Sequence, residues 1–322
     1  MEFWRNDVGR KWEETPDFRA LSAELPTSSS QPAKSPPWWL WPHVLSLEAP
    51  AVAMLWQLGL AKAHGLHLMP MVHVGLGLVV WIIYVMDRLW DTFRLPAAEM
   101  DMRHAFYRRH RVLFMTLVMP LALAAAGWIA LKEIPEGILW QAVSLAVFVA
   151  LYFFVYVARL APALMPRPHA AALLFALGCT ASIRFFSMPE TWADPMLECT
   201  VLTMLFLTNL SALAAKEEEA AGKPAHWHAA HPTLLGGNVL VMVAVLYYIQ
   251  KGSFDAVLLA PSVAVLVGLA LMTILHRFRG KLSVEQHRVL ADLAMVLPLP
   301  VIWLATTDLK TVLPPIGVLI PL

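Results

Sequence analysis

Charged residues are scarce in this chain. They make up 15% of its 322 residues, whereas an ordinary soluble domain carries about 25%. Cysteine occurs only as Cys179 and Cys199, both in apolar surroundings, which favours buried side chains over a disulfide. The first seven residues lack the apolar core of a cleaved signal peptide, so we expect insertion to use the later apolar segments. Strand patterns and the motifs of soluble nucleotide-binding domains are also missing, and no nucleic-acid partner is expected.

Hydrophobic residues are abundant, at 59% of the chain, and lie in runs close to the roughly 20 residues that a membrane-spanning helix requires. These runs predict an all-α, polytopic membrane helical bundle of about nine transmembrane helices. The predicted spans are 43–62, 70–90, 112–131, 137–160, 168–188, 196–215, 233–250, 254–276 and 287–306. Residues 1–36 are polar and end in a Ser/Pro-rich stretch, which predicts a disordered tail before a membrane domain at 37–322.

The basic residues predict the orientation of the bundle. With nine spans, the N-terminus and the loops after the even-numbered spans share one side of the membrane. Of the 24 Lys and Arg residues, only Lys62, Lys132, Lys251 and Lys310 fall on the other side, and Arg184 lies within a span. Because cytoplasmic loops carry the Lys/Arg excess, we predict a cytoplasmic N-terminus.

Two aspartates, Asp87 and Asp91, lie one helical turn apart where the second apolar run meets a basic loop. Like charges at this spacing repel, and carboxylates at a helix C-terminus face the negative end of its dipole. Departures of this kind are typical of functional sites. Two carboxylates about 6 Å apart along one helix face suit Mg²⁺. The neighbouring arginines suit phosphate; they are Arg88, Arg94, Arg103, Arg108, Arg109 and Arg111.

The sixth span ends in a second polar group on the same predicted side. Asn209 and Glu217 lie two turns apart there, and Glu217 could face the aspartates as an opposing ligand. A purely structural interpretation stays open for both groups. Interfacial Asp and Arg residues often pair with each other, and the acidic stretch 216–219 could be a solvated loop.

Nine helices with an aspartate-rich motif ending the second and an acidic motif ending the sixth resemble the UbiA superfamily of intramembrane prenyltransferases. The family's first motif is Asn-Asp-x-x-Asp-x-x-x-Asp. Asp87 and Asp91 match its last two positions, while Ile83 and Tyr84 occupy the first two. The second motif is reduced here to Asn209, Lys216, Glu217 and Glu219. Segments 45–50 and 288–298 are similar to divergent bacterial members, so we expect a bacterial inner-membrane protein.

The resemblance implies a transferase that uses Mg²⁺ to move a polyprenyl group from its diphosphate to a lipid-soluble acceptor. We expect this acceptor to be aromatic. It implies catalytic roles for Asp87, Asp91, Asn209 and Glu217. Of these, Asp87, Asp91 and Glu217 would bind the metal. The implied diphosphate contacts are Arg88, Arg94 and Arg108.

Two other classes of function compete with this one. The incomplete motifs favour a non-catalytic membrane scaffold or lipid-binding protein that retains the fold. A transporter would place polar groups near the membrane midplane, whereas the acids of this chain gather at one face.

Polar residues inside spans are further candidates. Glu48 could orient a basic residue or form an internal ion pair, and Asp292 could join the site or simply favour a helix N-terminus. We expect Arg184 to reach outward. Two histidine groups are interpreted as solvated loops, since neither has established ligand spacing; they are His64, His67 and His73, and His226, His228 and His231.

Overall fold

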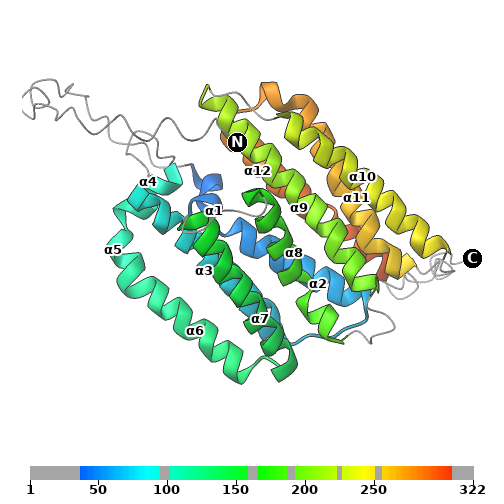
Figure 1. Ribbon diagram of the computed structural model, residues 1–322, viewed down its shortest axis with the longest axis horizontal. Coiled ribbons are helices and arrows are strands. Elements are labelled where there is room, and N and C mark those ends of the chain that lie inside the picture. Colours follow the sequence, from blue (N-terminus) through cyan, green and yellow to red (C-terminus); the bar gives the residue numbers. More distant parts are fainter. Residues whose placement is uncertain are drawn as a thin grey trace, which may run out of the picture. The chain divides into compact units, whose positions relative to one another are not determined.

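The computed structural model describes residues 37–94, 102–158, 166–186, 193–222, 227–250 and 256–306, and every regular element in these ranges is a helix. The prediction of an all-α bundle is therefore confirmed. The predicted tail at 1–36 lies outside the described residues. The chain divides into Met1–Trp38 and a second unit, Trp39–Leu322, which holds the bundle (Figure 1).

The helices follow one another along the chain with short connections between many of them. In sequence order they are η1 (Trp38–Leu40), α1 (Trp41–Val44), α2 (Glu48–Ala63), α3 (Pro70–Arg94), α4 (Met102–Arg109), α5 (Arg111–Leu113), the π-helical η3 (Phe114–Val118), α6 (Met119–Lys132), α7 (Glu136–Tyr152), the π-helical η4 (Phe153–Val157), α8 (Arg167–Phe186), α9 (Ala193–Ala220), α10 (Trp227–Gln250), α11 (Ala256–Phe278), η6 (Arg279–Lys281), α12 (Val284–Val296) and α13 (Leu299–Thr306).

Seven helical segments are long and apolar enough to cross a membrane. They are Pro70–Arg94, Arg111–Lys132, Glu136–Val157, Arg167–Phe186, Asp194–Ala220, Leu259–Lys281 and Val284–Thr306. An eighth is obtained if the bent pair Trp38–Val44 and Glu48–Ala63 forms one span, whereas the apolar part of α10, Gly236–Gln250, is shorter. By length and composition the protein is a multi-pass integral membrane protein. The count of nine spans stays a prediction.

The first predicted span is bent by 78° between α1 and α2. Ser46 lies at the bend with a φ of 54°, in the left-handed region that non-glycine residues seldom adopt. Tyr107 from α4 donates a hydrogen bond to the Ser46 hydroxyl across 3.3 Å. On a continuous helix, residues 43 and 48 would point about 140° apart. The bend instead brings His43 and Glu48 to 2.8 Å.

The core of the bundle is formed around α9. Buried residues of α2, α8, α9, α10, α11 and α12 make one continuous cluster, in which Leu202 and Leu205 of α9 and Trp56 of α2 are almost fully enclosed. A second cluster joins α3, α4, η3 and α6 through residues such as Val85, Tyr107 and Phe114. Figure 1 shows α9, α11 and α10 running alongside each other, and these helices are in contact. Polar residues of α9 lie toward its two ends, with Glu198 near the beginning and Glu217 near the end.

The outer helices α6 and α7 have apolar surfaces that no other described helix covers fully. Trp128, Leu131 and Trp140 are each more than 60% exposed. Only 6% of the most apolar part of the Glu136–Val157 span is buried. Such a surface is appropriate for contact with lipid, where apolar side chains need no burial within the protein.

Near the beginning of α9, His64 interacts with Glu198. The Nε2 atom of His64 lies 2.9 Å and 3.0 Å from the two carboxylate oxygens of Glu198, whose side chain is 1% exposed. The interpretation of the first histidine group as a solvated loop is therefore wrong for His64. In the second group, His228 and His231 belong to α10 and not to a loop.

The expectation for Arg184 is also wrong. Its guanidinium group donates to the Leu177 carbonyl at 3.0 Å and to the Thr180 hydroxyl, so it points back along α8. Because the Arg184 guanidinium group is partly buried, it takes its hydrogen-bond acceptors from its own helix and does not extend to water. Both cysteines are buried and free, as predicted.

The His64–Glu198 pair predicts a pH-dependent stability. Burial alone would lower the pKa of His64, but the hydrogen bond and the charge of Glu198 outweigh it and raise the pKa above 6.5. A raised folded-state pKa stabilises the fold fully below pH 6.5 and loses that contribution as pH rises through the folded value. We expect the thermal midpoint of the detergent-solubilised protein to fall as pH rises above this range. His64→Gln should flatten the dependence; an unchanged slope in this variant would contradict the assignment.

Candidate functional site

Polar side chains from several helices gather at one end of the bundle. The C-terminal ends of α3 and α9 lie there, together with α1, α4 and the N-terminal ends of α8 and α12. Direct contacts join these elements: Arg103 of α4 lies 4.0 Å from Glu217 of α9, and Arg288 of α12 hydrogen-bonds His43 of α1. The ends of the second and sixth predicted spans therefore lie at the same end of the bundle, as the alternation of helices predicts.

Asp87 and Asp91 both face cationic or histidine side chains. Arg167, at the start of α8, donates to the Asp87 carboxylate at 2.7 Å and to the Tyr152 hydroxyl at 3.0 Å. Asp91 lies 3.8 Å from the Arg88 guanidinium and 3.5 Å from His104. The two aspartates thus point to different partners, and neither Arg167 nor His104 was among the site residues expected from the sequence.

The three arginines predicted to bind diphosphate have different environments. Arg88 is partly buried and donates to His104 at 3.4 Å, and its Nε atom is buried without a hydrogen-bond partner. Arg94 donates to the carbonyl oxygens of Val157 and Ala158 at 2.5 Å and 3.0 Å, which satisfies the end of η4. Arg108 is exposed on α4. Only Arg88 is therefore near the buried polar groups of the site.

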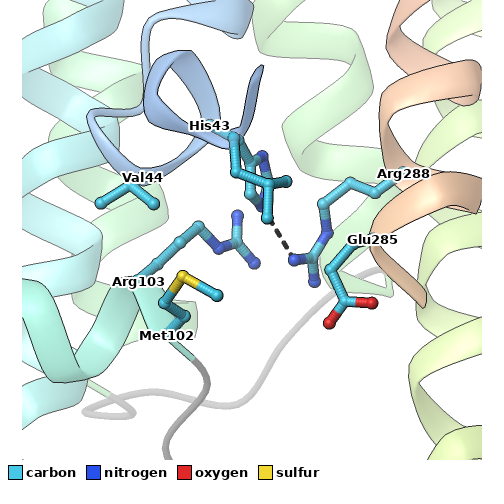
Figure 2. A pocket seen from close by; sticks show the side chains of 7 residues that line it. His43, Val44, Met102, Arg103, Glu285 and Arg288 are labelled. Atoms are coloured by element: carbon cyan, nitrogen blue, oxygen red, sulfur yellow. Dashed lines mark hydrogen bonds between the residues drawn. The ribbon is translucent and has the colours of Figure 1, made fainter. Parts of the chain in front are cut away.

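Glu217 joins α9 to α4 and α12. Its Oε1 atom accepts a hydrogen bond from Arg288 and lies 4.0 Å from Arg103. Arg288 also donates to His43 Nε2 at 2.8 Å. Arg103 and Arg288 are 8% and 7% exposed, so both charges are largely removed from water. Figure 2 shows their guanidinium groups pointing toward each other beside the His43 ring.

A small pocket lies at this point, with a cavity volume of about 30 Å³. It is lined by Leu40, His43, Val44, Met102, Arg103, Glu285 and Arg288. This volume admits a few water molecules. The Glu217 side chain, which pairs with Arg288 beside this pocket, is 52% exposed.

Next to the pocket, His43, Glu48 and Asp292 form a compact donor set. One possible ligand atom from each lies within 4.8 Å of the others. Asn209 of α9 lies beside Asp292, and its Nδ2 atom donates to Met295 Sδ at 2.8 Å. Glu48, Asp292 and Asn209 are visible in the sequence as polar residues within spans. Sequence reasoning missed His43, because only the bend at Ser46 brings it to Glu48.

Tyrosines connect the two halves of the site. Tyr84 of α3 lies within electrostatic range of Arg88, Glu48 and Asp292. Burial raises the pKa of Tyr107 on α4, so its hydroxyl stays protonated and can donate to Ser46. The carboxylates of α3 and the donor set of α1, α2 and α12 are therefore neighbouring parts of one polar region.

Comparison with protein-family models, with curated proteins and with solved structures finds no match for this chain.

Proposed function

We propose that this protein is an intramembrane transferase that binds a polyprenyl diphosphate and moves its prenyl group to a lipid-soluble, aromatic acceptor. The polar region would lie at the cytoplasmic surface of a bacterial inner membrane, with the N-terminus on the same side. The observation that carries the proposal is the convergence of buried arginines and carboxylates at one end of an apolar helical bundle.

Arginine supports a diphosphate ligand better than a simple anion, since its planar group contacts two phosphate oxygens at once. Arg103 and Arg288 converge from α4 and α12, and Arg88 has a buried donor without a partner. Glu217 accepts a hydrogen bond from Arg288. A diphosphate would compete with this carboxylate for the same donors, and the apolar helices would hold the prenyl chain.

These residues would assist departure of the diphosphate. The allylic C–O bond breaks with its electron pair remaining on the diphosphate, and the acceptor forms the new bond and gives up a proton. Arginines placed before the reaction stabilise the charge that develops on the leaving oxygen. Mg²⁺, when bound, would supply further charge neutralisation as a Lewis acid. Burial of the site within the bundle would exclude the water that could capture the prenyl group.

A second candidate function is a non-catalytic lipid-binding protein that retains this architecture. The observation that favours it is the 2.7 Å ion pair between Asp87 and Arg167, together with the contacts of Asp91 to Arg88 and His104. Carboxylates engaged in this way are less available to a metal ion, as in a site that has lost its catalytic role.

The test is the binding of farnesyl diphosphate and of a longer polyprenyl diphosphate to the detergent-purified protein, with and without Mg²⁺. We expect saturable binding that Mg²⁺ strengthens, followed by transfer to a hydroxylated aromatic acceptor. The proposal is overturned if the folded protein binds neither diphosphate. Binding without transfer to any aromatic acceptor supports the lipid-binding candidate instead.

A further inference from the structure

We propose that Glu48 and Asp292 are the primary ligands of a divalent cation of the Mg²⁺ type, with the amide oxygen of Asn209 as a third ligand. This inference deepens the proposed function, on which the role of the cation rests. The binding of the cation itself can be measured without a prenyl substrate. The proposed ligands differ from Asp87, Asp91 and Glu217, which the sequence predicts.

The geometry of the donor set is appropriate for one ion. The ligand atoms of Glu48 and Asp292, with that of His43, all lie within 4.8 Å of one another. Around an ion with bonds of about 2.1 Å, adjacent ligands are separated by about 3 Å and opposite ligands by about 4 Å. Modest side-chain adjustment therefore suffices to surround a cation.

Unsatisfied buried atoms provide the second observation. Glu48 Oε2 and Asn209 Oδ1 are both buried without a hydrogen-bond partner. Asn209 is 2% exposed, lies beside Asp292 and donates through Nδ2 to Met295 Sδ at 2.8 Å. A half-turn of the amide exchanges its oxygen and nitrogen, so the amide oxygen can take either position. Buried acceptors without partners require an explanation, and a bound cation supplies it.

His43 lies beside Glu48 and is not itself a ligand. Arg288 donates to His43 Nε2 at 2.8 Å, and arginine is a permanent donor. The proton of a neutral His43 must therefore reside on Nδ1, which lies 2.8 Å from Glu48 Oε1. A protonated nitrogen cannot coordinate a metal. The remaining ligands are oxygen atoms, and an all-oxygen set favours Mg²⁺ or Mn²⁺ over Zn²⁺.

The local charge also favours a cation. Glu48, Asp292 and Glu217 contribute three carboxylates, whereas Arg103 and Arg288 contribute two positive charges close to them. Arg288 has a close ion pair with Glu217, and the carboxylates of Glu48 and Asp292 face each other. Asp87, by contrast, already has Arg167 at 2.7 Å.

The test is Mn²⁺ binding to the purified full-length protein in detergent, followed by electron paramagnetic resonance, with Mg²⁺ as competitor. We expect one site that Mg²⁺ displaces. Glu48→Gln and Asp292→Asn should each weaken Mn²⁺ at least tenfold. Asp87→Asn/Asp91→Asn is the matched control and should bind as wild type does. The proposal is overturned if wild type does not bind, or if only the control variant loses binding.

A gain-of-function variant keeps the test decisive if the charge-removing variants do not fold. Asn209→Asp adds a third carboxylate at the same volume, so it should tighten Mn²⁺ about tenfold; unchanged or weaker binding argues against the site. Nitrogen coupling in the spectrum of the bound Mn²⁺ would overturn the oxygen-only assignment. Mn²⁺ binding in a protein that binds no polyprenyl diphosphate would sustain this site while removing the proposed function.

Discussion

Replacing both buried arginines, as Arg103→Gln/Arg288→Gln, is expected to weaken polyprenyl diphosphate binding at least 100-fold. A hydrogen bond to a charged group contributes about 1.5–3 kcal/mol. Losing two therefore amounts to about 3–6 kcal/mol, and each 1.4 kcal/mol is about a factor of ten in affinity. Glutamine retains a donor for Glu217, so the ends of α9 and α12 should still associate. The measurement is equilibrium binding of a fluorescent prenyl diphosphate in detergent.

Arg94→Gln is the matched control for this prediction. Arg94 is one of the arginines that the sequence predicts as a diphosphate contact, yet it is engaged with the carbonyl oxygens of Val157 and Ala158. We expect its replacement to leave diphosphate affinity within about threefold of wild type, at some cost in stability. A large loss of affinity in Arg94→Gln, with none in the double variant, would show that the ligand binds beside α3 instead.

Trp56→Ala is expected to destabilise the protein by about 3–5 kcal/mol. Trp56 of α2 is 0% exposed and lies where α2 contacts α12. Its Nε1 atom donates to the Met295 carbonyl at 3.0 Å. That carbonyl lies in the last turn of α12, where helix carbonyls have no intrahelical donor. The change therefore leaves both a cavity and an unsatisfied carbonyl. Unfolding in mixed detergent micelles measures the loss.

Trp56→Phe separates these two contributions. It keeps most of the ring volume and removes the donor, so we expect a smaller loss, of about 1–2 kcal/mol. Because Glu48 begins α2 and Asp292 lies one turn before Met295 in α12, Trp56→Ala should also weaken Mn²⁺ binding. Equal effects of both variants would mean that packing of the indole contributes little here.

Much of the architecture could be predicted from residue patterns. Apolar runs near the length of the bilayer predict membrane helices, because every backbone polar group in lipid must be satisfied within the helix. The predicted spans 70–90 and 112–131 fall within the Pro70–Arg94 and Arg111–Lys132 segments. Helix parity alone indicates that the ends of α3 and α9 lie at one end of the bundle. These features depend on the composition of each segment and on the order of the spans along the chain.

The first predicted span shows where this reasoning fails. The run 43–62 is interrupted by Glu48, Pro50 and Gln57, but these residues do not predict a bend of 78° at Ser46. The contact of Ser46 with Tyr107, which is 61 residues away, accompanies the bend. Without it, His43 would not be expected beside Glu48, and the donor set could not be anticipated.

The sequence by itself determined that this is a helical membrane protein in which Asp87, Asp91 and Glu217 lie at the ends of two parallel spans, beside a group of arginines. Hydropathy and charge act through the solvent and the bilayer, so they can be evaluated residue by residue. Only the tertiary structure decided which charges meet: Arg167 with Asp87, Arg288 with His43 across 245 positions, and Glu48 with Asp292. Buried charges select their partners by distance and desolvation, which depend on how helices far apart in the chain pack together.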